Sequence, residues 1–194
     1  MAENDELLQR KQKVTDLTNL GINVYPHKYD YTHTAAQIAE EFGDLQEGVE
    51  GTKEIRVAGR IMTTRDMGKA SFSNLKTDSN VKAAKPVEEA KTADQVQIYV
   101  RKDVLGDHKY ELYKKLDIGD FIGVEGNVFR TRTGELTIKV KDLTLLSKSM
   151  RPLPEKWHGL KDVETRYRQR YVDLVVNQPV KDVFITRSRI ISTL

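Results

Sequence analysis

The chain has 194 residues, with 32 Lys and Arg against 29 Asp and Glu, so its formal net charge is only +3. This length is enough to bury a core, and no run approaches the roughly 18 apolar residues that a membrane-spanning helix needs. The absence of cysteine excludes disulfides, iron–sulfur clusters, thiol catalysis and cysteine-ligated zinc. Since the N-terminus is acidic and lacks an apolar segment, we expect a cytoplasmic protein without a secretory signal and without a membrane partner.

The charge is distributed unevenly along the chain. Residues 1–50 carry 4 basic and 10 acidic side chains, residues 51–150 carry 19 and 14, and residues 151–194 carry 9 and 5. Because an acidic N-terminal segment precedes a basic remainder, a polyanionic partner could bind the basic part. Because such a balance is also common in proteins that bind no nucleic acid, charge alone does not identify the partner.

The first fifty residues predict a helical extension. Apolar residues between positions 5 and 20 fall near one face of a helix, and Gly21 supplies a stop signal. A connector with three tyrosines follows, and Thr34 and Gln37 form a capping-box pattern before a short helix that runs through about Phe42. Glycines at 43, 48 and 51 then mark a boundary, so we predict an N-terminal extension over 1–50.

From Glu54 the apolar residues follow the period of two that is typical of strands. We predict strands over about 54–61, 70–75, 96–100, 121–129 and 136–146, with a helix over 107–116 between the third and the fourth. This order matches the five-stranded OB-fold barrel, so the predicted fold class is mainly β with flanking helices, and the barrel domain is assigned to 51–150. Residues 76–94 contain almost no large apolar side chain, which predicts an inserted flexible loop at the barrel rim.

The last segment reads as a linker followed by helices. Residues 151–154 form a proline-containing linker, Asp162 is placed to cap a helix over 163–177, and Pro179 is placed to open a further apolar helix. The chain stops at Leu194 without a helix-ending signal, from which we expect a fragment.

No catalytic or metal-binding set is predicted in this chain. The run Gly68-Lys69-Ala70-Ser71 lacks the earlier glycine and the Lys-Ser/Thr pair of a phosphate loop, and the four histidines show no ligand spacing. No Ser-His-Asp set and no paired-carboxylate site is recognisable. The local evidence therefore favours a binding module.

An OB barrel binds single strands on the face of its second and third strands, with aromatic platforms and polar groups. Phe72 is placed to stack a base, or else fills the core; Gln97 can pair with a base edge, or is an ordinary exposed amide. Arg60 and Arg65, at the end of the first strand, can contact phosphate or a base edge, or simply face solvent. Glu135 can accept hydrogen bonds from a base, or is a plain turn carboxylate.

Several stretches together resemble the lysyl-tRNA synthetases of the bacterial type. They are 57–60 (VAGR), 67–72 (MGKASF), 131–136 (TRTGEL), 151–160 (RPLPEKWHGL) and 164–174 (ETRYRQRYVDL), in matching order over nearly the whole chain. The last two stretches are the most specific.

This resemblance implies that the barrel binds the mostly uracil anticodon of a lysine tRNA. It places the family's stacking phenylalanine at Phe72, its central-base glutamine at Gln97, its arginine at Arg65 and the carboxylate for the first anticodon base at Glu135. It also implies that the segment from Pro179 begins a class II catalytic domain, whose first motif helps form a homodimer. The full-length enzyme would use ATP and Mg²⁺ to charge tRNA with lysine, whereas this chain, which lacks the other motifs, would hold no cofactor or metal and would be inactive alone.

Alternatives remain open at this point. The aspartyl and asparaginyl synthetases share the barrel and the class, a stand-alone single-strand binder would need no catalytic partner, and a structural interaction domain has only the N-terminal helix in its favour. The insertion also departs from the family, which joins these strands by a tight turn. Its lysines at 82, 85 and 91 are offset by nearby carboxylates, so we expect the loop to lie in solvent rather than to contact phosphate.

Overall fold

The computed structural model describes residues 2–77, 94–153, 160 and 162–193. The chain divides into two compact units, Met1–Arg151 and Pro152–Leu194. The first unit holds the described strands, and the second is built from helices.

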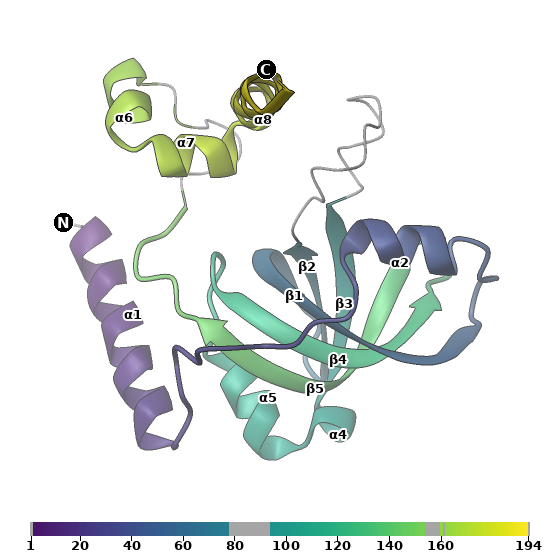
Figure 1. The fold of residues 1–194 in the computed structure, drawn as a ribbon. Helices are drawn as coiled ribbons and strands as arrows, with labels where there is room; N and C mark the ends of the chain where they lie inside the picture. The colour runs from purple at the N-terminus through teal and green to yellow at the C-terminus, as the bar shows by residue number, and fades with distance from the viewer. Residues whose placement is uncertain (1, 78–93, 154–159, 161, 194) are drawn as a thin grey trace. The chain divides into compact units, whose positions relative to one another are not determined.

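Five strands of the first unit close into a barrel in the order β1-β2-β3-β5-β4 (Figure 1). They are β1 (Glu50–Asp66), β2 (Ala70–Lys76), β3 (Gln95–Arg101), β4 (Phe121–Arg130) and β5 (Leu136–Ser147). The β3–β5 pair is parallel and the other pairs are antiparallel. This is the predicted OB-fold topology, so the fold class is confirmed.

Aliphatic side chains from alternate positions fill the barrel, as the period of two predicts. The buried set includes Ile55, Val57, Ile61, Leu75, Ile98, Val100, Ile122, Val124, Val128, Ile138, Val140, Leu143 and Leu145. At Gly126 the strands β4 and β5 approach too closely for a side chain, because an added Cβ would lie 2.0 Å from the Lys139 carbonyl oxygen. The β4–β5 register shifts at the same point, between Glu125 and Gly126. Glycine here therefore permits the bend by which the barrel closes.

Short helices lie across the two ends of the barrel (Figure 1). Helix α2 (Ala35–Phe42) starts with the predicted capping box, in which Thr34 and Gln37 hydrogen-bond reciprocally, and it lies near the end of β2. The helix predicted over 107–116 corresponds to α5 (Asp107–Lys114), and a short helix that was not predicted, α4 (Lys102–Leu105), precedes it. Gly106, at φ +78°, separates them, because its left-handed backbone turns the chain sharply. Tyr113 of α5 is buried and hydrogen-bonds to Ser73 of β2, which ties the helix to the barrel.

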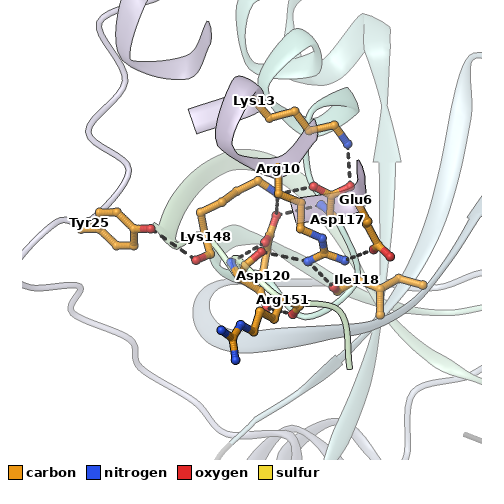
Figure 2. Close-up of polar contacts among 10 residues, drawn as sticks. Glu6, Arg10, Lys13, Tyr25, Asp117, Ile118, Asp120, Lys148 and Arg151 are labelled. Carbon is orange, nitrogen blue, oxygen red and sulfur yellow. Dashed lines mark hydrogen bonds and ion pairs between the residues drawn. The ribbon is translucent and has the colours of Figure 1, made fainter. Parts of the chain in front are cut away.

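The N-terminal helix α1 (Ala2–Asn19) is held to the barrel by charged groups (Figure 2). Arg10 is only 5% exposed, and its guanidinium donates to the carbonyl oxygens of Ile118 and Ser149 at 3.3 and 2.9 Å. Lys13 pairs with Asp117 at 2.5 Å. The helix thus docks on the loop before β4 and on the chain that leaves β5.

The structure describes only the two ends of the insertion predicted over 76–94, and it places them in the barrel. Lys76 belongs to β2, and Thr77 donates from its backbone nitrogen to the Asp94 carbonyl oxygen at 2.8 Å, so the ladder continues to these residues. The expectation for the lysines at 82, 85 and 91 lies outside the described residues, as does Pro154 of the predicted linker.

The second unit contains α6 (Val163–Arg168), α7 (Arg170–Val176) and α8 (Gln178–Thr193). Asp162 caps α6 as predicted, accepting a hydrogen bond from the Thr165 nitrogen at 2.7 Å. The single helix predicted over 163–177 is wrong: it breaks at Gln169, whose backbone leaves the helical region at φ −114° and ψ 54°. The carboxylate of Asp173, fully buried, binds Arg166 and Arg170 and so joins α6 to α7.

Candidate nucleic-acid interface

An aromatic platform lies on the outer face of β2 and β3. The inward side chains of β2 are Ser71, Ser73 and Leu75, so Phe72 points outward and is half-buried rather than part of the core. Tyr99 of β3 stands directly opposite Phe72, with ring centroids 4.7 Å apart and planes 32° apart. Phe129 of β4 meets Tyr99 edge-on, with the ring centroids 6.1 Å apart. The outer face therefore offers flat apolar surface on which a base can stack.

Arg65 lies beside this platform. It pairs with Phe72 across β1 and β2, and residues directly opposite in antiparallel strands share one face. Its side chain is exposed, and within the described ranges it has neither a hydrogen-bond nor an ion-pair partner. Its guanidinium is thus available to an RNA phosphate or carbonyl oxygen.

Gln97 and Glu135 lie together on the same face although they are 38 residues apart. The side-chain Nε2 of Gln97 donates to Oε2 of Glu135 at 2.8 Å, and its Oε1 accepts from the Thr137 hydroxyl at 2.9 Å. The parallel register of β3 and β5 places Gln97 opposite Thr137. The two residues that the resemblance assigns to different bases are therefore in direct contact.

The turn before β5 presents Glu135 to this face. The Thr131 nitrogen donates to the Glu135 carbonyl oxygen at 3.0 Å, and the Glu135 nitrogen donates to the Thr131 hydroxyl at 3.0 Å. Gly134 adopts φ +84°, which lets the turn close without strain. The turn thereby fixes the backbone from which the Glu135 side chain reaches Gln97.

Arg60 does not join this group. It was expected with Arg65 at the end of β1, but β1 continues to Asp66, so Arg60 lies in the middle of the strand. It pairs with Lys76 and with Phe121, and its guanidinium stands 4.3 Å from the centre of the Phe121 ring. Burial lowers the pKa of Arg60. Arg60 therefore lies at the opposite end of the β1–β2 pair from Arg65.

The acidic neighbour of Arg65 is neutralised by a different residue. Asp66 forms an ion pair with Lys114 of α5, and the hydrogen bond from Lys114 is the main cause that lowers the pKa of Asp66. Asp66 also accepts from the Gly68 nitrogen at 3.0 Å. The positive charge of Arg65 is thus left for a ligand rather than cancelled within β1.

Sequence reasoning missed three residues of this face: Tyr99, Asn74 and Thr137. Tyr99 follows Gln97 by two positions in one strand, so the strand period was a sufficient signal that both point outward. Asn74 is the partner of Gln97 across β2 and β3. No pattern in the sequence signals the contact of Thr137 with Gln97, because it depends on the register of β3 against β5.

Two further features were sought among the described residues: a metal-binding cluster and a membrane-spanning helix. No group of three or more His, Asp or Glu among them could hold a metal ion. No described helix has the length and apolar character to cross a membrane.

The closed β1-β2-β3-β5-β4 barrel, with its aromatic and polar outer face, defines the chain's first unit as an OB-fold domain. A family model for the tRNA anticodon OB-fold nucleic acid binding domain matches residues 89–146, which cover β3, β4 and nearly all of β5. The match contains Gln97, Tyr99, Glu135 and Thr137.

Curated lysine–tRNA ligases match nearly the whole chain. The chain is 51% identical to the enzyme of Syntrophomonas wolfei over 95% of its length, and 48% identical to that of Moorella thermoacetica over 100%. It is 44% identical to the enzyme of Bacillus cytotoxicus over 97% of its length. These matches confirm the resemblance to the lysyl-tRNA synthetases. The chain spans only about a third of the length of these relatives, 34 to 36%.

Proposed function

We propose that this chain is the anticodon-binding portion of a lysine–tRNA ligase, and that its partner is the anticodon loop of a lysine tRNA. The observation that carries the proposal is the outer face of β2 and β3, where two aromatic rings in close contact, an unpaired arginine and a glutamine–glutamate pair lie together within the described residues. Single-stranded loop bases are recognised by stacking on aromatic rings and by hydrogen bonds to their edges. The identity to lysine–tRNA ligases supports the choice of tRNA.

Each candidate residue has a role in this proposal. Phe72 stacks a base, Gln97 reads the edge of the middle base, Glu135 accepts from the first base, and Arg65 donates to a carbonyl or phosphate oxygen. Arg60, at the far end of the β1–β2 pair, contacts backbone phosphate. We keep the division into an extension over 1–50, an anticodon-binding domain over 51–150 and the start of a catalytic domain over 151–194.

The full-length protein, in this proposal, is a cytoplasmic homodimer that uses ATP and Mg²⁺ to activate lysine and transfer it to tRNA. ATP and Mg²⁺ bind in the part of the enzyme that this chain does not span. No described residue of α8 is buried, and Val183, Ile190 and Ile191 are 58 to 65% exposed. Such an apolar helix surface supports its being covered in the complete dimer.

Two alternatives are less well supported. An aspartyl or asparaginyl enzyme would share the barrel, but the enzymes of Syntrophomonas wolfei, Moorella thermoacetica and Bacillus cytotoxicus that match this chain are lysine–tRNA ligases. A stand-alone single-strand binder would not need the second unit, which these longer relatives also match. Equal affinity for arbitrary single-stranded DNA and for the lysine anticodon loop would favour that second alternative.

The proposal is tested by replacing the stacking ring. Phe72→Ala should weaken binding of a lysine anticodon stem-loop by about tenfold or more, because base–aromatic stacking contributes about 1–3 kcal/mol per base. The affinity is measured by fluorescence anisotropy with a labelled stem-loop.

Tyr31→Ala is the matched control, because Tyr31 is an exposed aromatic residue (54%) outside the strand face. It should leave the affinity unchanged. If both variants bind as tightly as the original chain, the outer face of β2 and β3 is not the binding site.

A further inference from the structure

A glutamine that reads a pyrimidine can present its amide in two orientations related by a half-turn. Uracil offers the N3 hydrogen as donor beside the O4 acceptor, whereas cytosine offers the N3 acceptor beside the N4 donor. Because an amide carries a donor and an acceptor side by side, a freely turning glutamine serves both bases. Discrimination between them needs a group that holds the amide in one orientation.

Glu135 is such a group. Its Oε2 lies 2.8 Å from the Gln97 amide, and a carboxylate only accepts hydrogen bonds, so the Gln97 atom facing it must be Nε2. A half-turn would bring the amide oxygen against the carboxylate, replacing a charge-assisted hydrogen bond with two facing acceptors. Glu135 therefore opposes the turn.

Thr137 holds the other side of the same amide. Its hydroxyl lies 2.9 Å from Oε1 of Gln97, and the residue is 0% exposed, so its position is determined by the barrel wall. A hydroxyl can donate or accept, and it therefore tolerates either orientation. Thr137 places the amide, while Glu135 selects its orientation.

The two hydrogen bonds leave part of the amide free. Nε2 keeps one hydrogen and Oε1 keeps one lone pair, which is one donor and one acceptor in a defined order. That order complements the edge of only one of the two pyrimidines. For a lysine anticodon the middle base is uracil.

We propose that Glu135 is a positioning residue for Gln97, and that by orienting the amide it makes the site select uracil over cytosine at the middle anticodon position. This inference rests on the proposed function, because Gln97 must face a base. Glu135 then has two effects: it contacts the first anticodon base, and through Gln97 it influences which middle base is bound.

The test compares two stem-loops that carry uracil or cytosine at the middle position and are otherwise identical. In the 194-residue chain, Glu135→Gln should lower the ratio of the two affinities by about tenfold, equivalent to about 1.4 kcal/mol. The reason is that a glutamine at 135 can donate or accept, so it no longer opposes the turn. Any weaker binding of the first base cancels in the ratio, because that base is the same in both RNAs.

Thr137→Val is the comparison variant, because it keeps the shape of the side chain and removes the hydroxyl. It should weaken binding to both RNAs and change their ratio less than Glu135→Gln does. A ¹⁵N spectrum of the free chain supplies a readout without RNA: Glu135→Gln should shift the Gln97 side-chain amide signals. Glu164→Gln, which alters an exposed carboxylate of α6, should leave them in place.

The outcomes separate the two claims. A selective original chain whose uracil-to-cytosine ratio is unchanged in Glu135→Gln overturns the positioning role and leaves the proposed function standing. No binding of the lysine stem-loop by the original chain overturns both. Gln97 amide signals that do not respond to Glu135→Gln overturn the hydrogen bond itself.

Discussion

Lys148 is a charged side chain that is buried in the barrel unit together with an acidic partner. Its side chain and that of Asp120 are both 0% exposed, and Lys148 Nζ lies 2.6 Å from Asp120 Oδ2 (Figure 2). Asp120 also accepts from the backbone nitrogens of Ser149 and Asp117 at 2.8 and 2.7 Å. The free-energy cost of burying these two charges is offset only while every partner is present.

Replacing Lys148 should therefore destabilise the protein strongly. Lys148→Met keeps the length of the side chain but leaves Asp120 buried without its cation, so the free energy of unfolding should fall by about 3 kcal/mol. Urea denaturation measures this change. Lys28→Met is the control: Lys28 pairs with Asp30 where both side chains are exposed, at 79% and 62%, and the change should stay within about 0.5 kcal/mol. Equal losses in the two variants would contradict this account of Lys148.

The candidate site was predictable only in part from single residues. The strand period placed Phe72 and Gln97 on strands, and the alternation of β2 then decides that Phe72 points outward. The hydrogen bond between Gln97 and Glu135 was not predictable, because it joins residues 38 positions apart through the pairing of β3 with β5. Local patterns carry no information on such a distance.

Ion pairs between α1 and the rest of the barrel unit contribute to the docking of this helix. Lys13 of α1 pairs with Asp117, and Asp16 pairs with Lys115 at 3.0 Å. Burial raises the pKa of Asp117, but hydrogen bonds from Lys13 and Lys148 outweigh it and lower the pKa. Hydrogen bonds from Gln12 and Lys115 lower the pKa of Asp16.

Acid should therefore release α1. A carboxylate whose pKa is lower in the folded state stabilises that state fully above its unfolded pKa, here about 3.8, and loses this contribution as the pH falls through the folded value. Hydrogen exchange of the α1 amides, followed from about pH 6 to about pH 3, should speed up below about pH 4 relative to the barrel amides. In Asp117→Asn the exchange should already be faster at pH 6 and depend less on acid. A pH response identical to that of the original chain would show that Asp117 does not hold the helix.

Helix existence was easier to predict than helix ends. The capping box at Thr34 and the cap at Asp162 are local side-chain-to-backbone bonds, and both appear as predicted. The additional helix α4 before Gly106 and the break at Gln169 were missed, because neither α4 nor α7 begins with a side-chain capping bond that the sequence could signal. Packing against neighbouring elements decides where a continuous pattern is interrupted.

The 194-residue chain combines a unit with an OB-fold and a second, helical unit, and it spans about a third of the length of its relatives. We expect the purified 194-residue chain to bind a lysine anticodon stem-loop and to show no ATP–pyrophosphate exchange, because the residues proposed for ATP and lysine lie in the remaining part of the enzyme. Exchange is measured with labelled pyrophosphate beside a full-length lysine–tRNA ligase as positive control. ATP–pyrophosphate exchange above background would contradict the proposal that ATP and lysine bind in the part of the enzyme that this chain does not span.

The sequence by itself determined the order of strands, the central helical region, the apolar interior and the family resemblance. These follow from periodicity and from short motifs, which are local properties of the chain. Only the tertiary structure decided that Arg60 stands apart from Arg65, that Tyr99 completes the aromatic platform with Phe72, and that Glu135 holds the amide of Gln97. The reason is physical: each of these arrangements depends on strand register and barrel closure, which bring distant residues within hydrogen-bond or stacking distance.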